Sequence, residues 1–257
     1  MAARPAKPPA APPPATTQTG PATATPPTDA SAPDLVRWAA DRFGDALVMS
    51  SSFGAQSAVL LHLVTRITPD IPVILADTGY LFPETYRFAD DLRQRLGLNL
   101  VVTAPAMTPA RLEATHGRLW TQGAEGLSRY HQIMKVAPLN QELERLGARA
   151  WIAGLRRSQG GSRSGLQPTE TQDGRLKVHP LWNWSRADVG KYMAEHELPY
   201  HPLVERGYAS IGDTHSTRPI SADEGEREGR FNGFAEECGL HVPRTSGEND
   251  SLESAGI

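Results

Sequence analysis

Apolar residues recur along this chain in two alternating spacings, one typical of helices and one of buried strands. The segment 34–43 carries leucine, tryptophan, alanine and phenylalanine at helical spacing, so packing should begin there. Four apolar runs of strand length follow, at 46–50, 71–77, 98–105 and 148–156. Runs this uniformly apolar are typical of strands buried on both faces of a parallel sheet.

Helix-like segments separate these runs. They are predicted at 55–67, 83–97, 138–147 and 185–199. Pro83 lies in the first turn of the second of these, Gly97 closes it, and Ser185 caps the last. Strands that alternate with helices predict an α/β fold with a doubly wound, mostly parallel sheet. The chain contains no internal repeat.

Three regions differ in composition. Residues 1–33 are Pro-, Ala- and Thr-rich with almost no large apolar residue, so we expect them to be disordered. Residues 34–220 form the predicted α/β domain. Residues 221–257 form a C-terminal segment that carries Cys238, and its polar end after His241 is expected to be a mobile tail.

The overall composition narrows the class of protein. A hydrophobic fraction of 39% is enough for a sizeable core, and a net charge of −3 gives no polybasic signature for nucleic acid or membrane. The sequence has neither an apolar run of about 18 residues nor a hydrophobic signal core near its start. A single cysteine cannot form an internal disulfide, so a soluble, cytoplasmic protein is expected.

Ligands of open parallel sheets bind beyond the carboxyl ends of the strands, so the loops there are the candidate site. The first loop offers small and hydroxyl residues that could hold an anion, namely Ser51, Ser52, Gly54, Gln56 and Ser57. The alternative is an ordinary serine cap with a glycine turn. The second loop holds Asp77, Thr78 and Gly79. Asp77 could accept hydrogen bonds from a ribose or an adenine amino group, or it could be a turn aspartate.

Basic residues concentrate in the later loops of a chain that is acidic overall. They are Arg156, Arg157 and Arg163 after Gly154, and then Arg218, Arg227 and Arg230. Arginine binds phosphate or sulfate through two parallel hydrogen bonds, so a small polyanion is the predicted ligand. A solvated basic loop is the alternative. Asp213 and His215 are weak evidence for a metal, and the eight histidines show no zinc-ligand spacing, so no metal is predicted.

Cys238 is the only cysteine. Free cysteines are more often buried small hydrophobes than nucleophiles, but this one lies in a polar segment without core periodicity. Nearby Arg227, Arg230 or His241 could lower the pKa of the thiol, whereas the two glutamates at 236–237 act in the opposite direction. The sequence leaves that balance open.

Residues from about 34 to 241 resemble the phosphoadenylyl-sulfate reductases, thioredoxin-dependent enzymes of sulfate assimilation and cysteine biosynthesis. The matching stretches are "SSSFGAQSAVLLHL", "IPVILADTGYLFPETYRF", "WIAGLRRSQ", "LPYHPLVERGYASIGDTHSTRPI" and "ECGLH". The resemblance implies an adenine-nucleotide α-hydrolase-like fold of the PP-loop type. That loop, S-G-G-x-D-S, corresponds to residues 52–57, with Phe53 for Gly and Gln56 for Asp. These two departures argue against ATP adenylation.

The resemblance implies attack of the Cys238 thiolate on the sulfate sulfur, which gives S-sulfocysteine and releases adenosine 3′,5′-bisphosphate. Lys135, Arg227, Arg230 and His241 match family positions that contact the phosphosulfate or lie beside the nucleophile. Reduction to sulfite needs two thiols and this chain has one, so reduced thioredoxin or glutaredoxin must supply the other. The resemblance also implies a homodimer without a bound cofactor.

Sister enzymes that act on adenylyl sulfate usually carry an iron–sulfur cluster on four cysteines. The corresponding positions here are Tyr130, His131, Asp213 and Ser216, so four thiolate ligands are lacking. This favours the 3′-phosphorylated substrate, with a cluster-free adenylyl-sulfate reductase as the alternative. Two minor alternatives are an ATP-pyrophosphatase-type adenylyltransferase and a non-catalytic nucleotide-binding redox sensor that uses Cys238 as its switch.

Overall fold

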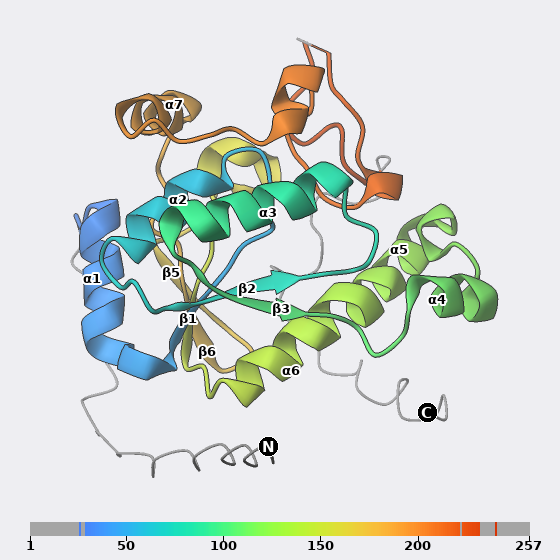
Figure 1. Ribbon diagram of the computed structural model, residues 1–257, viewed down its shortest axis with the longest axis horizontal. Coiled ribbons are helices and arrows are strands. Elements are labelled where there is room, and N and C mark those ends of the chain that lie inside the picture. The colour runs from blue at the N-terminus through green and yellow to red at the C-terminus, as the bar shows by residue number, and fades with distance from the viewer. Residues whose placement is uncertain (1–25, 27–28, 222, 232–239, 241–257) are drawn as a thin grey trace, which may run out of the picture.

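A twisted sheet forms the centre of the protein. The computed structural model describes residues 26, 29–221, 223–231 and 240 (Figure 1). Within them the sheet has six strands in the order β3-β2-β1-β4-β6-β5, and only β5 runs antiparallel to its neighbour. The strands are β1 Leu47–Ser50, β2 Pro72–Ala76, β3 Asn99–Thr103, β4 Ala150–Ile152, β5 Thr169–Gln172 and β6 Arg175–Val178.

Helices cover both faces of the sheet, which confirms the predicted doubly wound fold (Figure 1). They are α1 Ala32–Phe43, α2 Ser57–Thr65, α3 Pro83–Leu96, α4 Pro109–His116, α5 Gly123–His131, α6 Ala137–Arg145 and α7 Arg186–Glu195. Alternate residues of β1 point to opposite faces. Met49 packs with helices α1, α2, α3 and α7, whereas Val48 packs with α6.

Local chemistry explains where the predicted elements begin and end. The Ser185 hydroxyl accepts a hydrogen bond from the Asp188 amide at 3.1 Å and caps α7. Gly97 ends α3 in the left-handed conformation, as predicted. Helix α2 begins at Ser57, two residues later than expected, because Phe53 and Gln56 keep non-helical backbone angles.

The sequence analysis did not predict several helices and strands of the structure. Strands β5 and β6 form a hairpin whose turn residues, Asp173 and Gly174, both have positive φ. An Asp-Gly pair between alternating residues is a known hairpin signal, so this turn was readable from the sequence. Helices α4 and α5 were also missed, as was the π-helical turn Gln132–Val136 that joins α5 to α6.

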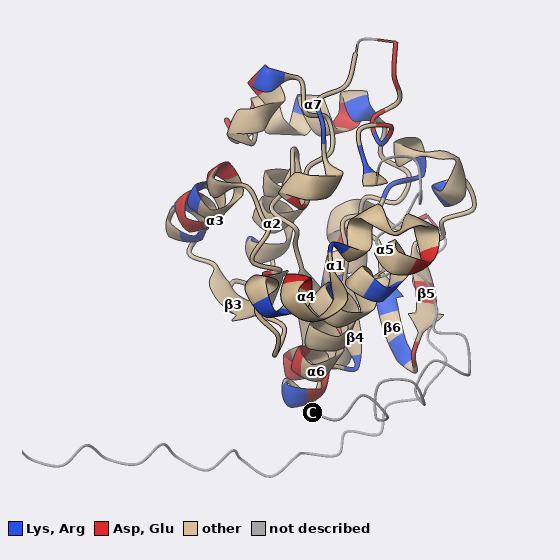
Figure 2. Cartoon of the chain, turned by 90° about the vertical axis from the view of Figure 1, so that its right-hand side faces the viewer, with Lys and Arg blue, Asp and Glu red and all other residues tan. Residues whose placement is uncertain are grey.

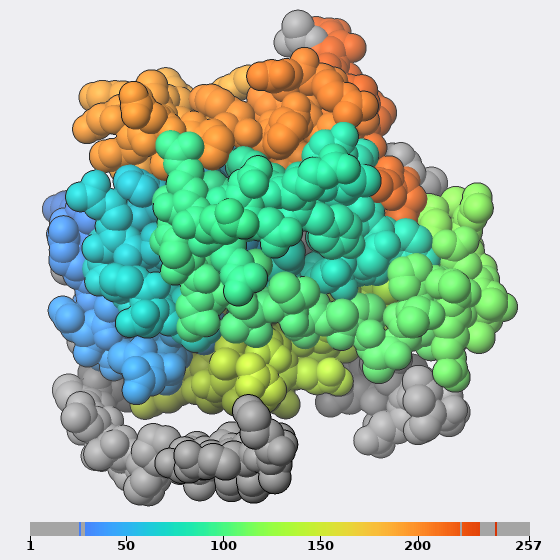
Figure 3. Space-filling model, in the orientation of Figure 1, coloured from blue at the N-terminus to red at the C-terminus, as the bar shows by residue number. Residues whose placement is uncertain are grey.

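The segment after β6 folds back over the helical layer. In the space-filling view it forms a continuous orange layer against α2 and α3 (Figure 3). Helices α3 and α6 each carry both acidic and basic residues (Figure 2). Among the described residues, no helix combines the length and apolar character needed to cross a membrane.

Candidate functional site

A cavity of about 240 Å³ lies at the carboxyl ends of β1 and β4. The chain runs from β1 outward through β2 to β3 and then returns to β4 on the other side of β1. This reversal is the topological switch point where open α/β sheets bind ligands. Four loops line the cavity, at 50–57, 153–159, 209–212 and 226–231.

The first loop presents its backbone and hydroxyl groups around the N-terminus of α2. The Phe53 amide donates to the Ser51 hydroxyl at 3.1 Å, and the Ser57 hydroxyl donates to the Gly54 carbonyl at 3.0 Å. Gln56 occupies the cap position, and no side chain in the described structure caps α2, so the reading of this loop as a serine cap is wrong. Uncapped amides at a helix N-terminus suit an anion.

Phe53 holds this loop in a strained conformation. Its φ is +47°, a region that favours glycine, and its side chain is completely buried in the main core. The PP-loop pattern has glycine at this position. Here the burial of the phenyl ring offsets the backbone strain, so the turn keeps the glycine-like conformation and also gains a core anchor.

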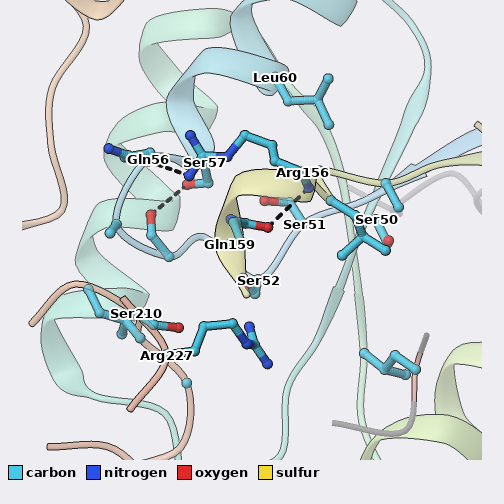
Figure 4. A pocket seen from close by; sticks show the side chains of 18 of the residues that line it. Ser50, Ser51, Ser52, Gln56, Ser57, Leu60, Arg156, Gln159, Ser210 and Arg227 are labelled. Atoms are coloured by element: carbon cyan, nitrogen blue, oxygen red, sulfur yellow. Dashed lines mark hydrogen bonds between the residues drawn. The ribbon is translucent and has the colours of Figure 1, made fainter. Parts of the chain in front are cut away.

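Arg156 is one of four buried cations that line the cavity, together with Lys135, Arg163 and Arg230. Its guanidinium donates to the Gln56 Oε1 at 2.8 Å and lies 3.6 Å from the Glu226 carboxylate (Figure 4). Gln159 accepts from the Arg156 amide at 3.1 Å and also from Arg163. Burial lowers the pKa of Arg156, although Glu226 opposes this shift. Glu226 lies 3.7 Å from a second cation, Arg186 of α7.

Arg227 and Arg230 approach the cavity from the segment 226–231. The Arg230 guanidinium donates to the Ser210 hydroxyl at 3.2 Å and lies 4.6 Å from the centre of the Phe231 ring. It packs closely on Gly212, so a side chain at that position would displace the end of Arg230. Arg227 lies 5.9 Å from the same ring.

Lys135 reaches the cavity from the π-helical turn, a type of distortion often found at functional sites. Its ammonium lies 2.5 Å from the carboxylate of Asp213, and both side chains are buried. The Thr78 hydroxyl donates to the other oxygen of Asp213 at 2.7 Å. Burial alone would raise the pKa of Asp213, but Lys135 and Thr78 outweigh it and lower the pKa to about 2.

An aromatic and histidine cluster surrounds this ion pair. The His215 ring stacks on the Trp120 ring, with their centroids 3.8 Å apart. It also packs edge-on against Tyr130 at a centroid distance of 4.8 Å, and His131 packs in the same way against Phe231 at 5.2 Å. Burial lowers the pKa of His131 to about 3 and that of His215 to about 4, so both rings are neutral near pH 7. Tyr130, His131, Asp213 and Ser216 lie in this region, since Tyr130 packs on His131 and the Ser216 amide donates to the Asp213 carbonyl at 3.2 Å.

Eleven of the residues that the sequence offered for ligand binding line the cavity. They are Ser51, Ser52, Gly54, Gln56, Ser57, Lys135, Gly154, Arg156, Arg163, Arg227 and Arg230. The two predicted catalytic residues, Cys238 and His241, lie outside the described residues. Within the described residues, no group of three or more His, Cys, Asp or Glu is arranged to hold a metal ion.

The second loop does not reach the cavity lining. Asp77 accepts from the Gly79 amide at 2.8 Å and from the Tyr86 hydroxyl at 2.7 Å, as a turn aspartate does. Gly79 has a φ of +72°, and a side chain there would also meet Pro109. Thr78 is buried and committed to Asp213. These residues support Lys135 through Thr78 and Asp213 but are not themselves part of the lining.

Two predicted arginines are also placed elsewhere. Arg157 donates to the Leu166 carbonyl at 2.7 Å and stacks 4.1 Å over the Trp182 ring. Arg218 is exposed and pairs with Glu224 at 2.5 Å. Their partners lie outside the cavity lining, and their roles as ligands stay predictions.

Four polar lining residues were not singled out from the sequence, namely Ser50, Gln159, Ser210 and Glu226. Gln159 lies in the quoted arginine-rich loop, and Ser210 lies in one of the matching stretches, so composition could have indicated both. Glu226 carried no signal, because a carboxylate is not expected in a site for anions.

The doubly wound sheet, the PP-loop-like first loop and the basic cavity at the switch point define a nucleotide-binding protein of the PP-loop type. The Phosphoadenosine phosphosulfate reductase domain matches residues 46–219. The chain belongs to this family.

Curated relatives agree with the family match. Phosphoadenosine 5′-phosphosulfate reductase of Alkalilimnicola ehrlichii is 58% identical over 212 residues, which cover 82% of this chain and 86% of the relative. The protein of the same name from Synechocystis is 50% identical over 231 residues, which cover 89% of this chain and 93% of the relative.

Solved structures agree on the fold. The phosphoadenylyl-sulfate reductase of Candida auris, in a phosphate complex, is 31% identical with a TM-score of 0.64, covering 74% of this chain and 91% of that one. FMN adenylyltransferase of Candida glabrata is 14% identical with a TM-score of 0.54, and the match covers 76% of this chain and 69% of that one. At this identity the likeness shows the fold alone.

Proposed function

We propose that this protein reduces 3′-phosphoadenylyl sulfate to sulfite and adenosine 3′,5′-bisphosphate in sulfate assimilation and cysteine biosynthesis. One observation carries the proposal: Lys135, Arg156, Arg227 and Arg230 converge with the serine loop on one cavity in a member of this reductase family. A nucleotide that bears several phosphate and sulfate groups is the ligand that such a cavity fits.

The first chemical step uses Cys238. Its thiolate attacks the sulfur of the sulfate, a sulfur–sulfur bond forms, and the bond from that sulfur to the bridging oxygen breaks. The electron pair of the broken bond leaves on the phosphate of adenosine 3′,5′-bisphosphate. Negative charge therefore grows on the leaving phosphate, and fixed cations such as Lys135 and Arg227 stabilise it.

The second step needs an external dithiol. One thiolate of reduced thioredoxin or glutaredoxin attacks the Cys238 sulfur, forms a mixed disulfide and releases sulfite. The second thiol of the donor then displaces Cys238, which returns as a thiolate, while the donor leaves as a disulfide. Two electrons pass from the donor to the sulfur in each cycle, and the enzyme needs no resident cofactor in this scheme.

The 3′-phosphorylated nucleotide is the proposed substrate, because the curated relatives carry the name of that reductase. A cluster-free reductase of adenylyl sulfate is the second candidate, since no residue of the cavity is identified as the ligand of the 3′-phosphate. We further propose a cytoplasmic homodimer that meets its thiol donor in solution.

Sulfite release with reduced thioredoxin tests the proposal directly. Wild-type protein should release more sulfite from the 3′-phosphorylated nucleotide than from adenylyl sulfate. Cys238→Ser should lower the rate by at least about a thousandfold, because the nucleophile is lost. Preference for adenylyl sulfate would change the substrate, whereas nucleotide binding without sulfite release from any donor would indicate a redox sensor. Pyrophosphate formed from ATP, Mg²⁺ and sulfate would instead indicate an adenylyltransferase.

A further inference from the structure

The β5–β6 hairpin buries a charged network beside the cavity. The Lys177 side chain is completely buried, and its ammonium donates to the Gln172 Oε1 at 2.7 Å. It also lies 3.2 Å from the Glu170 carboxylate and 4.9 Å from the centre of the Trp151 ring. Acidic and basic residues lie side by side on these two strands (Figure 2). A buried ammonium is costly unless such partners surround it.

Lys177 fixes the orientation of the Gln172 amide. An ammonium has only donors, so the amide must turn its oxygen toward Lys177. Its nitrogen then points the other way and donates to the Leu240 carbonyl at 3.2 Å. Lys177 and the Leu240 carbonyl therefore select the same orientation of the amide, with its oxygen toward the ammonium and its nitrogen toward the carbonyl.

Leu240 is the one described residue in the stretch from 232 to the C-terminus. Its side chain packs against the apolar cluster of α6 and the sheet face that includes Val48 and Trp151, and it lines the cavity. Leu240 follows Cys238 by two residues in the sequence. A contact that fixes Leu240 therefore limits how far the thiol can move from the cavity, since each residue extends the chain by at most about 3.6 Å.

We propose that Gln172 is a positioning residue, which holds the segment carrying Cys238 at the cavity through the Leu240 carbonyl, with Lys177 orienting its amide. The catalytic consequence rests on the proposed function, but the anchoring of the thiol does not. A network that only stabilised the hairpin would not need its amide donor to bond a residue 68 positions away in the sequence.

Gln172→Glu separates the two roles of the amide. The carboxylate still accepts from Lys177, so the hairpin keeps its buried partner, but it cannot donate to Leu240. Gln167→Glu is the matched control, because Gln167 is exposed in the segment just before β5 and bonds only locally to the Gly165 carbonyl. Gln172→Met, a neutral side chain of similar length without a donor, serves as a second variant.

Three measurements on the full chain test the proposal. Cys238 is the only cysteine, so the rate of iodoacetamide alkylation reports on it alone. In Gln172→Glu this rate should rise, and single-turnover formation of S-sulfocysteine should slow by about threefold to tenfold, as expected for one lost hydrogen bond. Affinity for adenosine 3′,5′-bisphosphate should stay unchanged, and Gln167→Glu should match wild type in all three measurements.

Unchanged alkylation and sulfonation in both Gln172 variants would overturn the proposal. So would slower sulfonation that only follows weaker nucleotide affinity. If Gln172→Glu does not fold, Gln172→Met decides the question by the same two rates. If wild-type protein forms no S-sulfocysteine, the proposed function fails, and the alkylation rates still test the anchor.

Discussion

Lys135 and Asp213 show how two opposite charges are stabilised inside the protein. Burial alone would raise the pKa of the Asp213 carboxyl, and a buried charge without a partner is costly on either side chain. Together they form a short ion pair, and Thr78 satisfies the second oxygen of the carboxylate. The arrangement leaves a fixed positive group at the cavity and explains why Asp213 is not available to a metal.

Asp213→Asn should lower the free energy of unfolding by about 3 kcal/mol, since it leaves the Lys135 ammonium buried without a counter-charge. Urea unfolding at pH 7 measures this change. Asp91→Asn, at an exposed site on α3, should change stability by less than about 0.5 kcal/mol. Adding Lys135→Met to Asp213→Asn should recover part of the loss, and a single variant as stable as wild type would contradict this account.

At the scale of elements, His201 caps the N-terminus of a short helix. His201 precedes the short 3₁₀ helix Pro202–Arg206, and its Nδ1 accepts from the Leu203 amide at 3.1 Å. Its Nε2 must then carry the proton that it donates to the Thr85 hydroxyl at 3.0 Å. Protonation of Nδ1 would remove the cap, and burial lowers the pKa of His201 to about 4.

The pH dependence of stability follows from that shift. The unfolded chain binds a proton at this histidine below pH 6.5, whereas the folded chain does so only below about pH 4. Stability from His201 is therefore complete above pH 6.5 and falls by about 3 kcal/mol as the pH drops to 4. His201→Asn keeps an acceptor for the Leu203 amide but does not titrate. Urea midpoints between pH 7 and 4.5 should depend less steeply on pH in this variant, and an unchanged slope would contradict the assignment.

The elements that the sequence predicted are those whose signals are local. Apolar runs marked β1 to β4, and Gly97 and Ser185 marked helix ends, because each depends on neighbouring residues. The π-helical turn at Lys135 was not predictable in this way, because no local sequence rule marks a π-turn. The β5–β6 hairpin was missed although its Asp-Gly turn was readable.

At the scale of the whole molecule, one thiol sets the stoichiometry of the proposed reaction. Each chain can accept one sulfo group before an external donor acts. Excess nucleotide without thioredoxin should therefore release one adenosine 3′,5′-bisphosphate per chain in a rapid phase and then stop. Quenched-flow chromatography measures that amplitude. Release that continues without a donor, or no rapid phase at all, would contradict a covalent intermediate on Cys238.

Topology brought most of the predicted site together. Residues 51–57 and 154–156 were expected to meet because both follow parallel strands, and the adjacency of β1 and β4 confirms this. The partners within the site could not be predicted. The contact of Gln56 with Arg156, and that of Lys135 with Asp213, join residues about a hundred and about eighty positions apart, and no periodicity encodes such pairs.

Glu226 gives the cavity a selectivity that its cations alone would lack. The carboxylate is attached to the same chain as Arg156, so it competes for that guanidinium at a high effective concentration. For a monovalent anion such as chloride the site is already partly neutralised, so its binding free energy is small. A ligand with several negative groups engages the remaining cations simultaneously and can displace the carboxylate. The abundance of simple salts in the cell should therefore matter little to occupancy.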